Sequence, residues 1–276
     1  MPLLELSDGS RIAYEVEGGG SPVLLIQGVG VAGAVWQPQV RALCDRHRVA
    51  SFDNRGLGAS VPLVGAISIE RLAGDALALM DALAFERAHV VGHSMGGVIA
   101  QELALRAPER VLSLSLLCTF ARGKDAVALS PWIVWTGMRT RVGTRRMRRH
   151  AFLDMIMPAA SLRSADRDAL AAELAAIFGR DLADQPPVAM KQLSATGRHD
   201  ASSRLAALAS IPTLVVSGAH DRIAPPTTGR RLAELIPGAR YVEIEDGAHA
   251  VVISGAERVN ALLIEHLDAV ERRRAA

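Results

Sequence analysis

The stretch VVGHSMGGVIAQELALRAPER, residues 90–110, decides the fold class. An apolar run leads into GHSMG, residues 92–96, and a helical pattern starts at once. This is the GxSxG pattern in its strand–turn–helix setting, which holds a serine on a strained turn above the edge of a sheet. Ser94 is therefore predicted to be a nucleophile, with the Met95 amide and the helix N-terminus placed to stabilise an anion. The alternative is a turn that merely contains a serine.

Strands and helices alternate on both sides of this motif. Apolar strand patterns occur at 3–7, 11–17, 22–27, 48–53, 88–93, 111–118, 211–218 and 240–245, and helical patterns separate most of them. This order predicts an α/β fold with a mostly parallel sheet and helices on both faces. The alternation stops between 121 and 203, where the pattern is helical without an obvious strand. We expect a core formed by 1–120 and 204–276 and an inserted helical cap at 121–203.

Composition sets limits on the class of protein. The chain has 276 residues, of which 50% are hydrophobic and 22% charged, which suits one α/β domain with an insertion. A formal net charge of +2 does not favour a nucleic-acid partner. No apolar run reaches about 18 residues, so no membrane span is predicted. The start lacks a secretory pattern, and Cys44 and Cys118 offer no disulfide scaffold, so we expect a cytoplasmic protein.

A nucleophilic serine needs a base, and the base needs a carboxylate to orient it. His249, in EIEDGAHAVV, follows the last strand pattern, and Asp221, in VVSGAHDRIAPP, follows the strand before it. The carboxyl ends of parallel strands meet at one edge of a sheet, which brings both side chains toward the serine. His249 is the predicted base and Asp221 the predicted acid. The competing candidates are His220 for the base and Glu245 or Asp246 for the acid.

The chain order Ser94, Asp221, His249 is the order of the α/β-hydrolase family, which this sequence resembles over nearly its whole length. The resemblance rests on GHSMGG, GAHDRIAP, DGAHAVV, FDNRGLGAS and PVLLIQG. It implies an eight-stranded, mostly parallel sheet with a helical cap after the sixth strand. Similar members include carboxylesterases, lactonases, carbon–carbon bond hydrolases and cofactor-free haloperoxidases. One departure is Gln27, which stands where relatives have a histidine.

A second motif, in LLIQGVGVAGAVW at 24–36, satisfies the GxGxxG spacing, and Asp53 lies twenty residues beyond Gly33. That pattern is typical of dinucleotide binding, which needs a helix that begins at the glycines. Pro38 fits the first turn of a helix and so places the helix start near Gln37, several residues too late. We therefore expect no dinucleotide and no other cofactor or metal; a plain loop is the remaining alternative.

The family resemblance implies another use for the glycine loop, in which the Val29 amide and the Met95 amide form an oxyanion hole. The predicted function is then a serine hydrolase that cleaves an ester, thioester or lactone through an acyl-enzyme on Ser94. Hydrolysis of a carbon–carbon bond in a diketone and perhydrolysis use the same triad and are the alternatives. A slow or non-catalytic ligand receptor on the same fold is the alternative from another class.

The insertion is expected to select the substrate, a small molecule with an apolar acyl or alcohol part. Aromatic and methionine side chains can line an apolar pocket, although cap helices also bury such residues against each other. The candidates for the pocket are Trp36, Trp132, Trp135, Met138 and Met155, with Met147, Phe152, Met157 and Phe178 as further possibilities. The arginine-rich run at 139–149 is either a solvated helix face or a surface that attracts an anionic substrate or partner to the cap. A homodimer is a further expectation.

Overall fold

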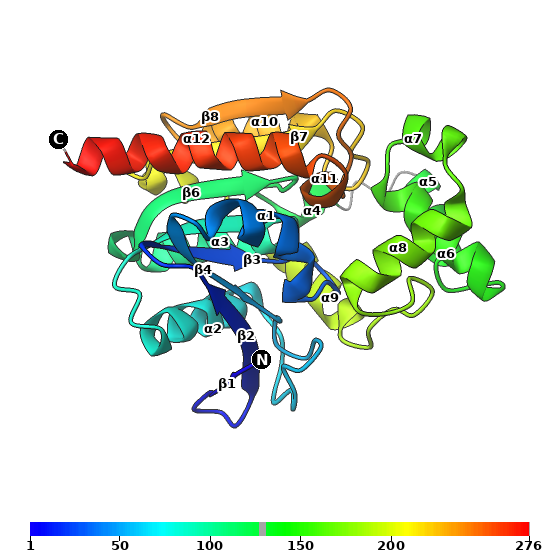
Figure 1. Ribbon diagram of the computed structural model, residues 1–276, viewed down its shortest axis with the longest axis horizontal. Coiled ribbons are helices and arrows are strands. Elements are labelled where there is room, and N and C mark those ends of the chain that lie inside the picture. Colours follow the sequence, from blue (N-terminus) through cyan, green and yellow to red (C-terminus); the bar gives the residue numbers. More distant parts are fainter. Residues whose placement is uncertain (127–130, 276) are drawn as a thin grey trace.

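The computed structural model describes residues 1–126 and 131–275 and is built around one eight-stranded sheet (Figure 1). The strand order is β1-β2-β4-β3-β5-β6-β7-β8. The strands are β1 (Leu3–Glu5), β2 (Arg11–Glu17), β3 (Ser21–Ile26), β4 (His47–Phe52), β5 (Ala88–His93), β6 (Val111–Leu117), β7 (Thr213–Gly218) and β8 (Arg240–Ile244). The pairs β1–β2 and β2–β4 are antiparallel, and the other neighbours are parallel. The predicted mostly parallel sheet is confirmed.

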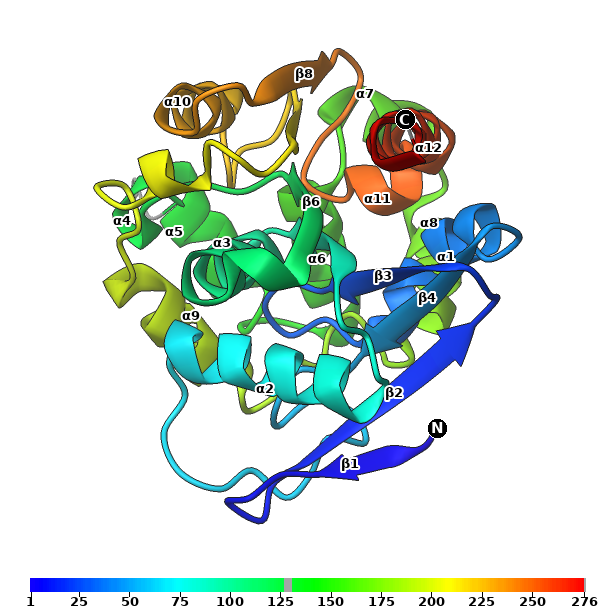
Figure 2. The same cartoon turned by 90° about the vertical axis from the view of Figure 1, so that its left-hand side faces the viewer.

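Helices cover both faces of the sheet, as Figure 2 shows end-on. One face carries α1 (Gln37–Leu43), α11 (Val251–Ser254) and α12 (Ala256–Ala275), and the other carries α2 (Ile69–Ala82), α3 (Met95–Arg106) and α10 (Pro226–Leu235). Successive residues of β3 point to opposite faces, so that Val23 and Leu25 join one core and Leu24 and Ile26 the other. Because helices cover both faces of the sheet, the parallel strands have nearly continuous apolar sequences instead of alternating ones.

Six α-helices occupy the described part of the chain between β6 and β7. They are α4 (Gly123–Ala126), α5 (Pro131–Arg139), α6 (Arg145–Ile156), α7 (Ala159–Ser164), α8 (Arg167–Phe178) and α9 (Ala189–Arg198). The chain leaves the core and returns to it at adjacent points, because Arg122 forms a β-bridge with Asp200. We propose the division into a core at 1–120 and 204–276 and a cap at 121–203 on this basis.

The cap lies beyond the carboxyl ends of the parallel strands, where the arrowheads point in Figure 1. It has an apolar cluster of its own that includes Phe152 and Phe178 and extends onto Val35 and Ala250 of the core. The Ala250 N–H also donates to the Ile156 carbonyl at 2.9 Å. Cap and core are therefore joined at this end of the sheet by apolar packing and by a backbone hydrogen bond.

The α-helix that follows β3 does not begin at the glycines of the loop. A single 3-10 turn spans Gly33–Trp36, and α1 begins at Gln37 with Pro38 in its first turn, as predicted. Asp53 is engaged in holding this loop, since its Oδ1 accepts the Gly33 N–H at 2.8 Å. A Cβ at Gly33 would lie 2.8 Å from the Phe52 carbonyl, so the close approach requires glycine. The α-helix N-terminus, which a pyrophosphate would need at the glycines, thus lies at Gln37.

Among residues 1–126 and 131–275, we find no helix with the length and apolar character needed to cross a bilayer.

Candidate active site

Ser94 occupies the tight turn between β5 and α3, with φ = 55° and ψ = −121°. A positive φ in a residue other than glycine costs about 1–3 kcal/mol, which surrounding contacts must offset. The Ser94 N–H donates to the Leu117 carbonyl at 2.9 Å, and the Ser94 carbonyl accepts from Thr119 Oγ1 at 2.7 Å. A Cβ at Gly92 would lie 2.3 Å from the Gly96 carbonyl, so the turn closes only with glycine there.

Three side chains that follow different strands meet at this turn. His249 Nε2 lies 3.0 Å from Ser94 Oγ, and His249 Nδ1 lies 2.8 Å from Asp221 Oδ2. The other carboxylate oxygen, Oδ1, accepts the N–H groups of Ile223 and Ala224 at 2.8 and 2.9 Å. Ser94, Asp221 and His249 are 8%, 3% and 8% exposed. Such an arrangement can provide a nucleophile, a base and an orienting acid in a largely dry site.

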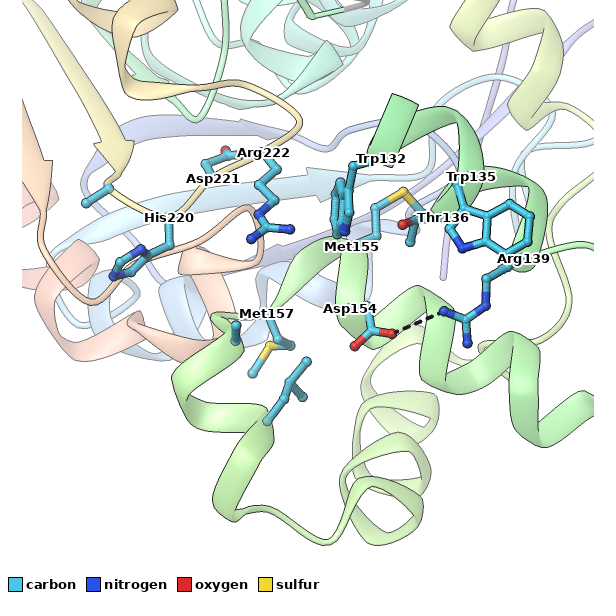
Figure 3. A pocket seen from close by; sticks show the side chains of 13 residues that line it. Trp132, Trp135, Thr136, Arg139, Asp154, Met155, Met157, His220, Asp221 and Arg222 are labelled. Carbon is cyan, nitrogen blue, oxygen red and sulfur yellow. Dashed lines mark ion pairs between the residues drawn. The ribbon is translucent and has the colours of Figure 1, made fainter. Parts of the chain in front are cut away.

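The competing candidates lie elsewhere. Glu245 and Asp246 are exposed, and within the described residues neither has a hydrogen bond to His249. His220 is exposed as well, and its ring points away from Asp221 in Figure 3. Position therefore separates Asp221 from the other carboxylates, because its two backbone donors fix the direction of the group.

His93, the residue before Ser94, contacts the backbone of His249. Its Nε2 donates to the His249 carbonyl at 2.8 Å, and the two ring centroids are 5.0 Å apart. Burial, followed by the neighbouring His249, lowers the pKa of His93 to about 3. His93 thus remains neutral at physiological pH and supports the loop that carries His249 without adding charge to it.

Two backbone N–H groups in the segments next to Ser94 have no acceptor in the described part of the chain. Within residues 1–126 and 131–275, neither the Val29 N–H nor the Met95 N–H has a protein acceptor. Met95 is the first residue of α3, whose first-turn amides have no partner within the helix. The glycine loop lies directly against the serine, because a Cβ at Gly28 would lie 3.0 Å from Ser94 Cβ. The two segments that carry these free donors therefore lie next to Ser94.

A cavity of about 600 Å³ opens between cap and core beside Asp221 (Figure 3). Its apolar wall comes from the cap and includes Trp132, Trp135, Met155, Met157 and Leu162. On the core side, the Arg222 guanidinium lies 4.4 Å from the Trp132 ring centroid. Three of the five principal pocket candidates, Trp132, Trp135 and Met155, thus line one space.

The structure differs from the expectation at the other pocket candidates. Trp36 is 0% exposed and packs in the core beneath α1 and α12, with its ring edge-on to His93 at 6.4 Å. Met138 is 48% exposed and does not line the cavity beside Asp221. The 3-10 turn before α1 rotates Trp36 inward, and Met138 lies on the outer side of α5. Of the further candidates, Met157 lines the cavity, Met147 is exposed, and Phe152 and Phe178 form the cap's own core.

Gln192, on the cap helix α9, lies at the glycine loop, although no motif pointed to it. Its Oε1 accepts the Gly30 N–H at 2.8 Å. A signal was nevertheless present in the sequence. Val188, Gln192 and Ala195 are spaced as one helical face, and all three are buried, so a glutamine stands among apolar positions.

A model of the alpha/beta hydrolase fold family matches residues 21–256. The chain belongs to this family. A protein of Azorhizobium caulinodans, named "Putative carbamate hydrolase RutD", is 33% identical over 254 residues, which are 91% of this chain and 92% of that protein.

Solved structures of alpha/beta hydrolases superpose closely. The enol-lactonase from Burkholderia xenovorans LB400 has a TM-score of 0.81 and 30% identity, over 97% of this chain and 100% of that one. The meta-cleavage product hydrolase from Pseudomonas fluorescens IP01, in a mutant form complexed with acetates, has a TM-score of 0.76 and 25% identity, over 98% of each chain. The protein is therefore a hydrolase of this fold that acts on a small molecule.

In this hydrolase the arginine-rich run at 139–149 is largely neutralised within the cap. Arg145 pairs with Asp184 at 2.7 Å and with Asp181 at 2.8 Å. Arg146 pairs with Asp168 at 2.8 Å, and Arg149 also pairs with Asp181. The run is thus a solvated helix face held to the next cap segments, which favours the structural interpretation over the anionic ligand.

Proposed function

We propose that this hydrolase cleaves a carboxylic ester, a thioester or a lactone through an acyl-enzyme on Ser94. One observation carries the proposal, namely the 3.0 Å contact between His249 Nε2 and Ser94 Oγ, backed by Asp221 at 2.8 Å from the other ring nitrogen. A free serine is a weak nucleophile. A hydrogen-bonded imidazole overcomes this because it accepts the serine proton as the oxygen attacks.

Acylation begins when Ser94 Oγ attacks the substrate carbonyl carbon and His249 Nε2 takes the hydroxyl proton. Asp221 accepts the Nδ1–H of His249, which keeps the lone pair on Nε2 and stabilises the imidazolium that forms. The Nε2–H then protonates the leaving alcohol or thiol as its bond to the carbonyl carbon breaks. A lactone follows the same steps, and its leaving hydroxyl stays attached to the acyl chain.

Deacylation reverses the roles with water as the nucleophile. His249 Nε2 takes a proton from the water, whose oxygen attacks the acyl carbon. The proton then returns to Ser94 Oγ, and the carboxylic acid leaves. Because the triad is largely buried, its hydrogen bonds act at low local polarity.

The Val29 and Met95 amides supply the proposed oxyanion hole. Both tetrahedral intermediates place a negative oxygen beside Ser94, and both N–H groups are free there within the described chain. Loss of one such donor typically lowers the rate by roughly 10² to 10³. A glycine follows each of the two residues, Gly30 after Val29 and Gly96 after Met95, so the backbone can approach the substrate closely.

The cap wall of the cavity beside Asp221 is apolar and suits an apolar acyl or alcohol part, whereas Arg139, Asp154 and Arg222 make other parts of its lining charged. Its wall includes Trp132 and Met155, which contact irregular apolar groups well. Relatives named as an enol-lactonase and as a thermophilic esterase, the latter from Thermogutta terrifontis, support the lactone and ester classes. Hydrolysis of a carbon–carbon bond in a diketone is the second candidate, favoured by the likeness to the meta-cleavage product hydrolase.

Turnover of p-nitrophenyl esters, lactones and a diketone by wild type and Ser94→Ala tests the proposal. We expect release of p-nitrophenol and fluorophosphonate labelling by wild type, both abolished in the variant. Labelling that persists in Ser94→Ala would remove Ser94 as the nucleophile. Turnover of the diketone alone would select the second candidate, and formation of a peracid from hydrogen peroxide and an acyl donor would select perhydrolysis. Binding without turnover across the panel would favour a receptor.

We also propose a cytoplasmic location and a homodimer. Cys44 and Cys118 are unpaired, which suits a reducing compartment. Sedimentation equilibrium measures the oligomeric state directly, and a monomer across the concentration range would contradict the homodimer.

A further inference from the structure

The turn Gly28-Val29-Gly30, which carries the proposed oxyanion donor, is held from two sides. On the core side, Gln27 Oε1 accepts the Gly28 N–H at 3.0 Å. Asn54 Nδ2 donates to the Gln27 carbonyl at 2.9 Å. These contacts fix the chain immediately before Val29.

The other side of the turn is held by the cap. Gln192 Oε1 accepts the Gly30 N–H at 2.8 Å, and Arg180 Nη2 donates to the Gly30 carbonyl at 3.2 Å. The Arg180 guanidinium lies 5.9 and 5.7 Å from the ring centroids of Phe152 and Phe178, and burial lowers its pKa. Both backbone polar groups of Gly30 are therefore bonded to cap side chains that are themselves packed in place.

The turn has little stiffness of its own. Gly30 has φ = +67°, a conformation that glycine adopts without steric cost. Because glycine has no Cβ, its backbone can also adopt other conformations easily. The hydrogen bond within the loop, from Val31 N–H to the Gly28 carbonyl, is long at 3.4 Å. The direction of the Val29 N–H thus depends on the contacts that hold the peptides on either side of it.

Gln192 is an unusual residue for its position. It is 0% exposed, and within residues 1–126 and 131–275 its Nε2 has no hydrogen-bond partner. An unpaired buried amide is unfavourable, and a methionine or leucine would avoid that cost. The contact with Gly30 is the hydrogen bond that the side chain makes in the described structure. Ala189 and Pro186 lie 3.4 and 3.6 Å from the Cβ position of Gly30, so this part of the cap is seated on the turn.

We propose that Gln192, assisted by Arg180, is a positioning residue for the oxyanion hole. The cap holds the Val29 N–H in line with the developing oxyanion and so contributes to the chemical step as well as to substrate selection. The proposal rests on the proposed function, because it requires an oxyanion at Ser94.

Gln192→Met tests the proposal, with Lys191→Met as the matched control on the exposed side of the same helix. Both variants are assayed for kcat and KM with a p-nitrophenyl ester and for inhibition by an alkylboronic acid, which forms a tetrahedral anion on the serine. We expect Gln192→Met to lower kcat by about 10- to 100-fold, less than the complete loss of a donor. KM should stay within about threefold, and the boronate inhibition constant should rise in parallel with the loss in kcat. Lys191→Met should match wild type in all three.

An unchanged kcat in folded Gln192→Met would overturn the proposal. So would a loss of kcat without weaker boronate binding, because that pattern marks a general structural effect. If Gln192→Met does not fold, as judged by its thermal transition, Arg180→Met is measured for the same three quantities. Wild type that hydrolyses no ester would instead refute the proposed function, so the two failures remain distinct.

Discussion

Replacing Asp221 by asparagine keeps the shape of the acid and reverses the hydrogen bond that it makes to His249. The carboxylate Oδ1 accepts two backbone donors, from Ile223 and Ala224, while Oδ2 faces His249 Nδ1. An asparagine side chain must keep its oxygen at the two donors, so its NH2 faces Nδ1. His249 then carries its proton on Nε2, where it cannot accept the proton of Ser94.

The expected loss is about 10⁴-fold in kcat, which equals about 5.5 kcal/mol of transition-state stabilisation. The rate of fluorophosphonate labelling should fall with kcat, because both depend on the nucleophile, whereas KM should change little. Asp246→Asn is the matched control, since it makes the same change at an exposed carboxylate in the loop before His249. Activity of Asp221→Asn within about tenfold of wild type, or a comparable loss in Asp246→Asn, would refute the assignment of the acid.

Two further predictions concern stability. Asp75→Ala should lower the free energy of unfolding, measured with urea, by about 3 kcal/mol. The substitution leaves the Arg55 guanidinium, which is 2% exposed, with Asp8 as its remaining carboxylate partner. A loss below about 1 kcal/mol would contradict this prediction. Burial lowers the pKa of His89 to about 4, below its unfolded value of about 6.5, so the unfolded state binds the proton first. Stability should therefore be full above about pH 6.5 and fall toward about pH 4, and His89→Gln should flatten that slope; an unchanged slope would count against it.

The meeting of Ser94, Asp221 and His249 could be predicted from the sequence, because each residue follows a strand whose carboxyl end can be recognised there. GxSxG marks the end of β5, and apolar runs mark the ends of β7 and β8. Once the sheet is parallel, the ends of its strands share one edge, and the side chains after them are neighbours. No knowledge of helix packing is needed for that step.

The pocket could not be predicted to the same degree, because it depends on the direction in which each helix faces. Trp36 stands beside the glycine loop in the sequence, yet the turn before α1 points it into the core. Gln192 lies 162 positions from Gly30, and the fold of the cap brings the two together. Single-residue propensities carry no information on such a contact. The sign of it in the sequence is a polar residue, Gln192, on an otherwise apolar helix face.

The hydrogen bond between Ala250 and Ile156 bears on how this enzyme could be engineered. It joins the cap helix α6 to Ala250, the residue after His249. A cap transplanted from a relative would place its backbone carbonyl groups differently, and the loop that carries His249 would lose this hydrogen bond. Chimeras made by exchanging residues 121–203 should therefore have a lower kcat as well as a different substrate preference. Libraries confined to the cavity wall, at positions such as Trp132 and Met155, keep the native cap and its hydrogen bond to Ala250, and would test whether this cavity sets the substrate range.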